Sequence, residues 1–179
     1  MKRLLASQAD DDLELLEAPA DGEVATRLLA RYYEELASRF PGGFDVDRSV
    51  AAPEVELRPP SGCFLIVRID GRSVGCGAVR KLDENTAEVK RMWIDPSVRG
   101  RGVGRRLLAG LESAAERLGC QLVRLDTSSH LPEALGLYRS SGYTEIPAYN
   151  DNFYAHHWFE KSLGSKTPAG THTSAKEPA

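Results

Sequence analysis

The stretch EVKRMWIDPSVRGRGVGRRLL, residues 88–108, decides the fold that the sequence predicts. Its first half is an extended segment that Pro96 ends, because proline has no N–H for a sheet ladder and disfavours helix at the residue before it. A turn rich in glycine and arginine follows at residues 99–106. Apolar residues then recur at steps of three and four through residues 103–118, as on one face of a helix. The stretch therefore predicts a strand, a glycine turn and a helix in succession.

The glycine–arginine turn has the features of an anion-binding site. Glycine lets the backbone approach a ligand closely, and the first N–H groups of a helix have no partner inside the helix. The helix dipole disfavours cations at this end unless an anion sits beside them. Four arginines nevertheless fall there: Arg99, Arg101, Arg105 and Arg106. The alternative is a basic turn that is simply solvated.

The glycine spacing fits neither of two common nucleotide motifs. Gly100, Gly102 and Gly104 give G-x-G-x-G, where a dinucleotide-binding fold requires G-x-G-x-x-G. A Walker loop requires a lysine after its glycines, and Arg105 stands there instead.

Two motifs together resemble a known family. The pattern Arg99-x-x-Gly102-x-Gly104, after a strand that ends Met-Trp-Ile-Asp-Pro, resembles the acetyl-CoA signature of the GCN5-related N-acetyltransferases. The segment ALGLYRSSGY at residues 134–143 is similar to the A-x-x-L-Y-x-x-x-G-[YF] segment of the same family. The resemblance covers roughly residues 63–163 and implies the acyl-CoA N-acyltransferase fold.

The elements expected elsewhere agree with an α/β fold built on a mixed, largely antiparallel central sheet flanked by helices. A short strand is expected at residues 13–17, and Asp21 is the expected N-cap of a helix that ends before Pro41. The pair Asp70-Gly71 predicts a hairpin between two strands, and a buried strand is expected at residues 121–127. A short helix from Pro132 and a last strand at 154–163 complete a single predicted domain, residues 1–163. Residues 164–179 are expected to be a flexible tail or an expression remnant.

Composition limits the partners. The 179 residues carry 23 Lys and Arg against 26 Asp and Glu, a formal charge of −3, which argues against a general nucleic-acid binder. Cys63, Cys76 and Cys120 lack the spacing of a zinc site or a disulfide framework, so no metal is expected. No stretch is long enough to span a membrane, and a cytoplasmic protein is expected. The resemblance allows a homodimer.

The resemblance implies acetyl-CoA as co-substrate. Backbone groups of Met92 and Ile94 would pair with the pantetheine arm as with an added strand, and one N–H would polarise the thioester carbonyl. Loop N–H groups would hold the pyrophosphate. Leu131 stands where many family members have an asparagine, so no polar contact is assigned to it. The predicted cofactor-binding residues are Met92, Trp93, Ile94, Arg99, Gly100, Arg101, Gly102, Val103, Gly104, Arg105 and Tyr138.

The resemblance also suggests the catalytic residues. Tyr138 stands where the family often places the acid that protonates the leaving thiolate; alternatively it only packs beside the sulfur. Glu88 is the predicted base, with a structural carboxylate, an ordered water or one of His156 and His157 as alternatives. Lys90 and Arg91 on the same strand favour an acceptor with a carboxylate or phosphate.

The function expected from these residues is direct transfer of an acetyl group from acetyl-CoA to a primary amine of a small molecule. A protein or peptide acceptor and a non-catalytic acyl-CoA-binding module are the alternatives.

Overall fold

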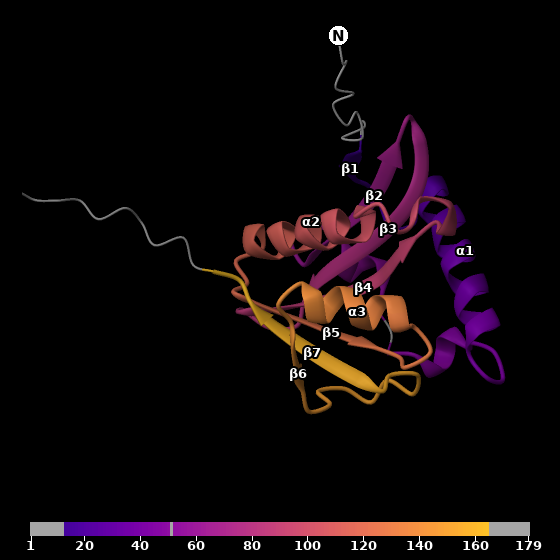
Figure 1. Ribbon diagram of the computed structural model, residues 1–179. Helices are drawn as coiled ribbons and strands as arrows, with labels where there is room; N and C mark the ends of the chain where they lie inside the picture. Colours follow the sequence, from indigo (N-terminus) through magenta and orange to yellow (C-terminus); the bar gives the residue numbers. More distant parts are fainter. Residues whose placement is uncertain (1–12, 51, 165–179) are drawn as a thin grey trace, which may run out of the picture.

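The computed structural model describes residues 13–50 and 52–164, which form one seven-stranded mixed sheet with helices on both faces (Figure 1). The strand order is β1-β2-β3-β4-β5-β7-β6, and β4 and β5 are the parallel pair. The strands are β1 (Glu14–Glu17), β2 (Gly62–Ile69), β3 (Arg72–Lys81), β4 (Thr86–Ile94), β5 (Leu122–Thr127), β6 (Thr144–Ile146) and β7 (His157–Ser162). The helices are α1 (Glu23–Arg39), α2 (Val103–Arg117) and α3 (Pro132–Ser140), with short 3-10 turns η1 (Val46–Arg48), η2 (Glu54–Leu57) and η3 (Pro96–Val98).

Apolar residues on both faces of the central strands hold the helices in place. On one face, α2 buries Leu107 and Leu111 among Val67 and Val123. On the other face, α1 packs against Phe64, Trp93 and their neighbours. Because β2 to β4 are covered on both sides, their residues are buried almost without interruption rather than in alternation.

The turn and helix-end signals are confirmed at several positions. Asp70 and Gly71 join β2 and β3 with φ values of 49° and 75°, the left-handed conformation that such a tight hairpin requires. Gly119, with φ of 88°, follows α2 as expected for a C-terminal glycine, and the next N–H, of Cys120, bonds the carbonyl of Ala115.

Three details differ from the expectation. The N-cap of α1 is Gly22, not Asp21, and no side chain caps this helix end. The last strand begins at His157 rather than at residue 154, because the preceding polar residues form hydrogen-bonded turns. The three-residue strand β6 was not predicted. The predicted tail lies outside the described residues from 165 onward.

The parallel strands β4 and β5 part soon after they meet. They pair over Thr86, Ala87 and Glu88, opposite Leu122, Val123 and Arg124. Past this point the ladder between them stops, although β4 continues to Ile94 and β5 to Thr127. The diverging ends leave backbone groups of β4 free to bind a ligand. Across residues 13–50 and 52–164, no helix is long and apolar enough to cross a membrane.

Candidate active site

The turn between β4 and α2 is held by a buried carboxylate and by glycines. Asp95 accepts hydrogen bonds from the N–H and the hydroxyl of Ser97, at 2.9 and 2.8 Å, and pairs with Arg31 at 2.7 Å. These hydrogen bonds from Ser97, and the attraction of Arg31, lower the pKa of Asp95. Gly102 is the N-cap of α2 with φ of 77°, which a side chain would strain. The first N–H groups of α2 therefore have no capping side chain and face an open site.

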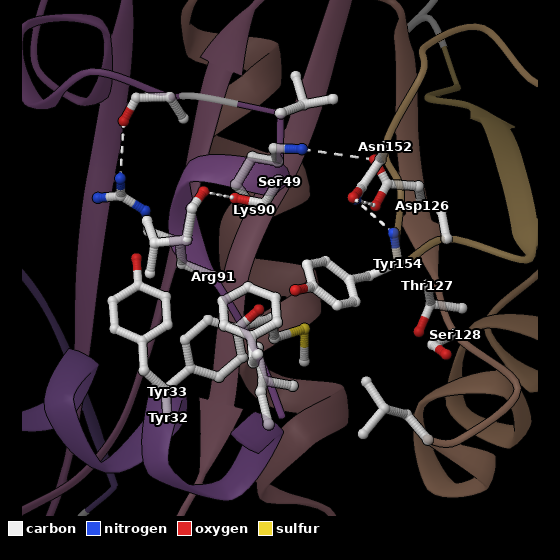
Figure 2. A pocket seen from close by; sticks show the side chains of 18 of the residues that line it. Tyr32, Tyr33, Ser49, Lys90, Arg91, Asp126, Thr127, Ser128, Asn152 and Tyr154 are labelled. Atoms are coloured by element: carbon white, nitrogen blue, oxygen red, sulfur yellow. Dashed lines mark hydrogen bonds and ion pairs between the residues drawn. The ribbon is translucent and has the colours of Figure 1, made fainter. Parts of the chain in front are cut away.

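Two cavities meet beside the diverging strands. One, of about 440 Å³, lies against the glycine turn and the start of α2. The other, of about 370 Å³, lies between α1, the segment after it and the ends of β4 and β5 (Figure 2). Residues that line both cavities are Tyr32, Leu36, Met92, Leu131, Ala134 and Tyr138. We call the first the turn cavity and the second the aromatic cavity.

The turn cavity collects the residues predicted to bind the cofactor. All of the predicted residues line it except Arg101. Gly104, in the first turn of α2, lies where an added Cβ would come within 3.5 Å of Leu137 and 3.9 Å of Met92. Arg105 reaches from α2 to α3 and donates to the carbonyl and the hydroxyl of Ser140, at 3.1 and 2.9 Å. The cavity is thus bounded by the turn, α2 and α3.

Arg99 forms an ion pair within the chain that could not be predicted from the sequence. Its guanidinium forms a double hydrogen bond with Glu35 of α1, at 2.9 and 2.6 Å, and donates to the carbonyl of Ile94 at 2.8 Å. Glu35 also accepts from the Trp93 indole at 2.7 Å and pairs with Arg39 at 2.8 Å. Partial burial alone would raise the pKa of Glu35, but these hydrogen bonds and the nearby arginines lower it. Glu35 therefore ties α1 to the turn.

We expect Glu35→Ala to lower the free energy of unfolding by about 1–3 kcal/mol, because charge-assisted bonds are lost and the Trp93 N–H loses its acceptor. Since the folded-state pKa is lowered, this contribution is present above the pKa of an unfolded glutamate, about 4.3, and is lost as the pH falls further. Urea unfolding at several pH values measures it. Glu34→Ala, at the exposed neighbouring position, is the matched control. Equal stability of the two variants would contradict the bridging role.

Tyr138 lies where the two cavities meet. Its hydroxyl is 3.9 Å from the sulfur of Met92, and its ring packs against Tyr143 and Phe159 with centroid distances of 5.9 and 6.2 Å. Burial raises the pKa of Tyr138, and the nearby Asp126 raises it further. The hydroxyl is therefore a neutral donor at the junction of the cavities.

Glu88 lies away from both cavities. It is 1% exposed and occupies the last position at which β4 pairs with β5, before the strands diverge. Its two oxygens accept from Arg80 at 2.9 Å and from the Tyr149 hydroxyl at 2.9 Å, and Lys90 is 3.5 Å away. The carboxylate lines neither cavity, although it contacts Lys90, which lines the aromatic cavity.

A carboxylate that the sequence analysis did not select lies in the aromatic cavity instead. Asp126, near the end of β5, accepts from Asn150 at 2.8 Å and Asn152 at 2.7 Å, and lies 3.4 Å from Lys90. The sequence could have indicated Asp126, because it stands near the carboxyl end of a predicted strand, where parallel sheets commonly bind ligands.

The histidines are engaged elsewhere. His156 contacts the Ser128 hydroxyl at 3.0 Å, and His157 lies between Ser129 at 3.0 Å and Glu145 at 2.6 Å. Neither histidine lines the turn cavity or the aromatic cavity.

A sheet that opens between two parallel strands, with a glycine turn and a helix start beside the opening, defines an acyl-CoA N-acyltransferase fold. A crystal structure of a GNAT-family acetyltransferase from Staphylococcus aureus matches it with a TM-score of 0.70 and 17% identity, over 85% of this chain and 99% of the other. PaiA N-acetyltransferase from Thermoplasma acidophilum, solved with coenzyme A, matches with a TM-score of 0.65 and 13% identity, over 85% and 99%.

The sequence gives the family directly. Residues 27–143 match the acetyltransferase (GNAT) family, and the chain belongs to it. An IAA acetyltransferase of Azospirillum brasilense is 37% identical over 90 residues, 50% of this chain. The match spans 59% of that relative's length.

Proposed function

We propose that this protein transfers an acetyl group from acetyl-CoA directly to a primary amine of a small molecule. The observation that carries the proposal is the meeting of the turn cavity and the aromatic cavity at Tyr138 and Met92, beside the part of β4 that no longer pairs with β5. A cofactor in one cavity and an acceptor in the other would bring their reacting atoms together there. Coenzyme A in the Thermoplasma protein, which has the same fold, supports the choice of cofactor.

The turn cavity suits the cofactor in shape and chemistry. Uncapped N–H groups at the start of α2 would bind the pyrophosphate, with no side chain at Gly102 in the way. Backbone groups of Met92 and Ile94, past the end of the β4–β5 ladder, would bind the pantetheine arm. Because Arg99 is engaged by Glu35, its proposed role is to fix the turn rather than to meet the phosphates with its guanidinium.

In the proposed reaction the amine nitrogen attacks the thioester carbonyl, a C–N bond forms, and the C–S bond breaks. The departing sulfur accepts the proton of the Tyr138 hydroxyl, which is held at the junction of the cavities. The nitrogen keeps one hydrogen in the amide and releases its other proton to the Tyr138 oxygen, which restores the hydroxyl. The amine must first lose a proton. Asp126 is the carboxylate of the aromatic cavity beside Tyr138, so we assign it to attract the ammonium group and take that proton. Glu88 then acts as a positioning residue, because it holds Lys90, which also contacts Asp126.

Acetyl-CoA is expected to raise the stability of the protein. A ligand at one hundred times its dissociation constant adds about 2.7 kcal/mol. Thermal unfolding with acetyl-CoA, with coenzyme A and without ligand measures binding, and thiol release with a panel of amines measures turnover. Stabilisation without turnover on any small amine would replace this proposal by a protein acceptor or a non-catalytic acyl-CoA-binding module.

A matched pair of glycine variants locates the binding. Gly102→Val strains the turn, since φ is 77° there, and should abolish the stabilisation by acetyl-CoA. Gly71→Val creates the same strain at φ of 75° in the β2–β3 hairpin, away from both cavities, and should retain it. Loss in both variants, or in neither, would contradict a cofactor site at the turn.

The relative from Azospirillum brasilense is named for acetylation of IAA, which supports a small-molecule acceptor for this chain. The aromatic cavity, at about 370 Å³, is of a size that accommodates a small molecule.

A further inference from the structure

The aromatic cavity has a strained cation on its wall. Arg91 lines it and has φ of 53°, a left-handed conformation that is uncommon for a residue with a long side chain. The strain arises at a β-bulge, where the β3–β4 register shifts between Cys76 and Ala78. Bulges redirect side chains near active sites, and backbone strain of this kind is unfavourable unless the surrounding structure enforces it. Here the strained residue is the one that presents a guanidinium to the cavity.

This guanidinium has no carboxylate partner among residues 13–50 and 52–164. Within these residues, its one hydrogen bond goes to a neutral acceptor, the carbonyl of Ala52, at 2.8 Å. The other cation of the cavity, Lys90, is already paired with Asp126 and Glu88 at 3.4 and 3.5 Å. A half-buried guanidinium with spare donors gains most from an anion that it can hold with paired hydrogen bonds.

The charges of the cavity are divided between its sides. Figure 2 shows Arg91 and Tyr33 on one side and Asp126 on the other, where Thr127 and Ser128 follow it. Tyr33 and Arg91 both line the cavity, on the same side of it in Figure 2. Burial raises the pKa of Tyr33, although Arg91 opposes this shift, so the Tyr33 hydroxyl is a neutral second donor on the side of the guanidinium.

We propose that the acceptor is an amino carboxylate with an apolar or aromatic body, whose carboxylate is bound by Arg91 and the Tyr33 hydroxyl while its amine lies toward Asp126 and Tyr138. This inference rests on the function proposed above and names the class of acceptor. Four aromatic side chains on the wall suit an apolar body: Tyr32, Phe40, Phe44 and Tyr154.

A carboxylate fits this cavity better than a phosphate. Besides Asp126, the cavity is lined by Asp47 and Glu54, so carboxylates outnumber cations on its wall. A phosphate dianion would add repulsion that a single unpaired guanidinium does not offset, whereas a carboxylate brings one charge and a planar pair of oxygens.

The test compares acceptors that differ only in the carboxylate. Thiol release is measured for phenylalanine against phenethylamine and for leucine against 3-methylbutylamine, with β- and γ-amino carboxylates and an aminoalkyl phosphate as further arms. The wild-type protein is expected to favour the carboxylate member of each pair by about tenfold or more in kcat/KM, because a hydrogen bond to a charged group stabilises the bound acceptor by that amount.

The diagnostic variant is Arg91→Asn, since asparagine tolerates the left-handed conformation of the bulge. It should lower kcat/KM for amino carboxylates by about 10- to 100-fold and change that for the plain amines by about twofold at most. Arg91→Lys keeps the charge without the planar guanidinium, so its kcat/KM for amino carboxylates should lie between those of the wild type and Arg91→Asn. Arg27→Asn, at an exposed pair with Glu23 on α1, is the matched control and should resemble the wild type.

The possible outcomes distinguish the carboxylate site from the proposed function. Equal efficiency of the wild type on both members of the pairs, or equal loss on both in Arg91→Asn, would overturn the carboxylate site while the acetyltransferase function stands. Preference for the aminoalkyl phosphate would replace the carboxylate by a phosphate. Stabilisation by acetyl-CoA without turnover on any amine would overturn the proposed function itself and this inference with it.

Discussion

Tyr138→Phe is expected to lower kcat by about 10²- to 10⁴-fold and to leave the affinity for coenzyme A nearly unchanged, because it removes one proton donor and no backbone contact. The lost hydroxyl lies 3.9 Å from the Met92 sulfur, at the junction of the cavities. Pre-steady-state thiol release measures the chemical step, and titration with coenzyme A measures binding.

The direction of the pKa shift determines how the rate should depend on pH. Burial raises the pKa of Tyr138, so the hydroxyl stays protonated at about pH 10, where an ordinary tyrosine titrates. Its contribution should therefore persist as the pH rises through that value.

Tyr143→Phe is the matched control for this variant. Tyr143 is a buried tyrosine whose ring packs against Tyr138, yet it lines neither cavity. The Tyr143→Phe variant also loses a buried hydroxyl, but its kcat should stay close to that of the wild type. If Tyr138→Phe retains full turnover, Tyr138 only packs beside the cofactor and another group protonates the thiolate.

Glu88→Ala is expected to lower the free energy of unfolding by about 3 kcal/mol or more, because breaking a buried ion pair leaves its partner charge insufficiently compensated. The partner, Arg80, has a side chain only 11% exposed and keeps Glu56 as its remaining carboxylate. The Tyr149 hydroxyl would also lose its acceptor. Denaturant unfolding measures the change. Glu14→Ala, which breaks the exposed pair with Arg68, should cost about 1 kcal/mol at most.

Glu88→Gln separates support from catalysis. Glutamine keeps an oxygen for Tyr149 but replaces the charge and the oxygen that faces Arg80 by an NH2 group, so a positioning role predicts a modest loss of kcat/KM and an unchanged shape of the pH–rate profile. A base would behave differently: its loss lowers the rate by about 10²- to 10⁴-fold and removes the ascending part of the profile. The second result would restore Glu88 as the base and exclude Asp126 from that role.

The strand, turn and helix around the turn cavity could be predicted from the sequence because their determinants are local. The strand before Pro96, the glycines of the turn and the apolar face of α2 lie within one continuous stretch, and their conformations depend on neighbours in the chain. The Asp70-Gly71 hairpin was predictable for the same reason.

Other parts of the candidate site depend on contacts between distant residues, which a single sequence does not encode in readable form. Arg99 meets Glu35 from 64 positions away, and Asn150 reaches Asp126 across 24. The bulge at Arg91 results from the pairing of β4 with β3, not from any turn residue in β4. Glu88 was chosen for its place on the strand, whereas its environment depends on Arg80 and Tyr149.

The short ladder between β4 and β5 has a consequence for how the protein is built. Three residue pairs connect the two parts of the sheet directly: β1 to β4 on one side, and β5, β7 and β6 on the other. If a pantetheine arm lies along β4 beyond its pairing with β5, the co-substrate bridges the two parts of the sheet. Binding of acetyl-CoA would then also strengthen the connection between the two parts. Release of coenzyme A after each turnover would remove this bridge until the next acetyl-CoA binds.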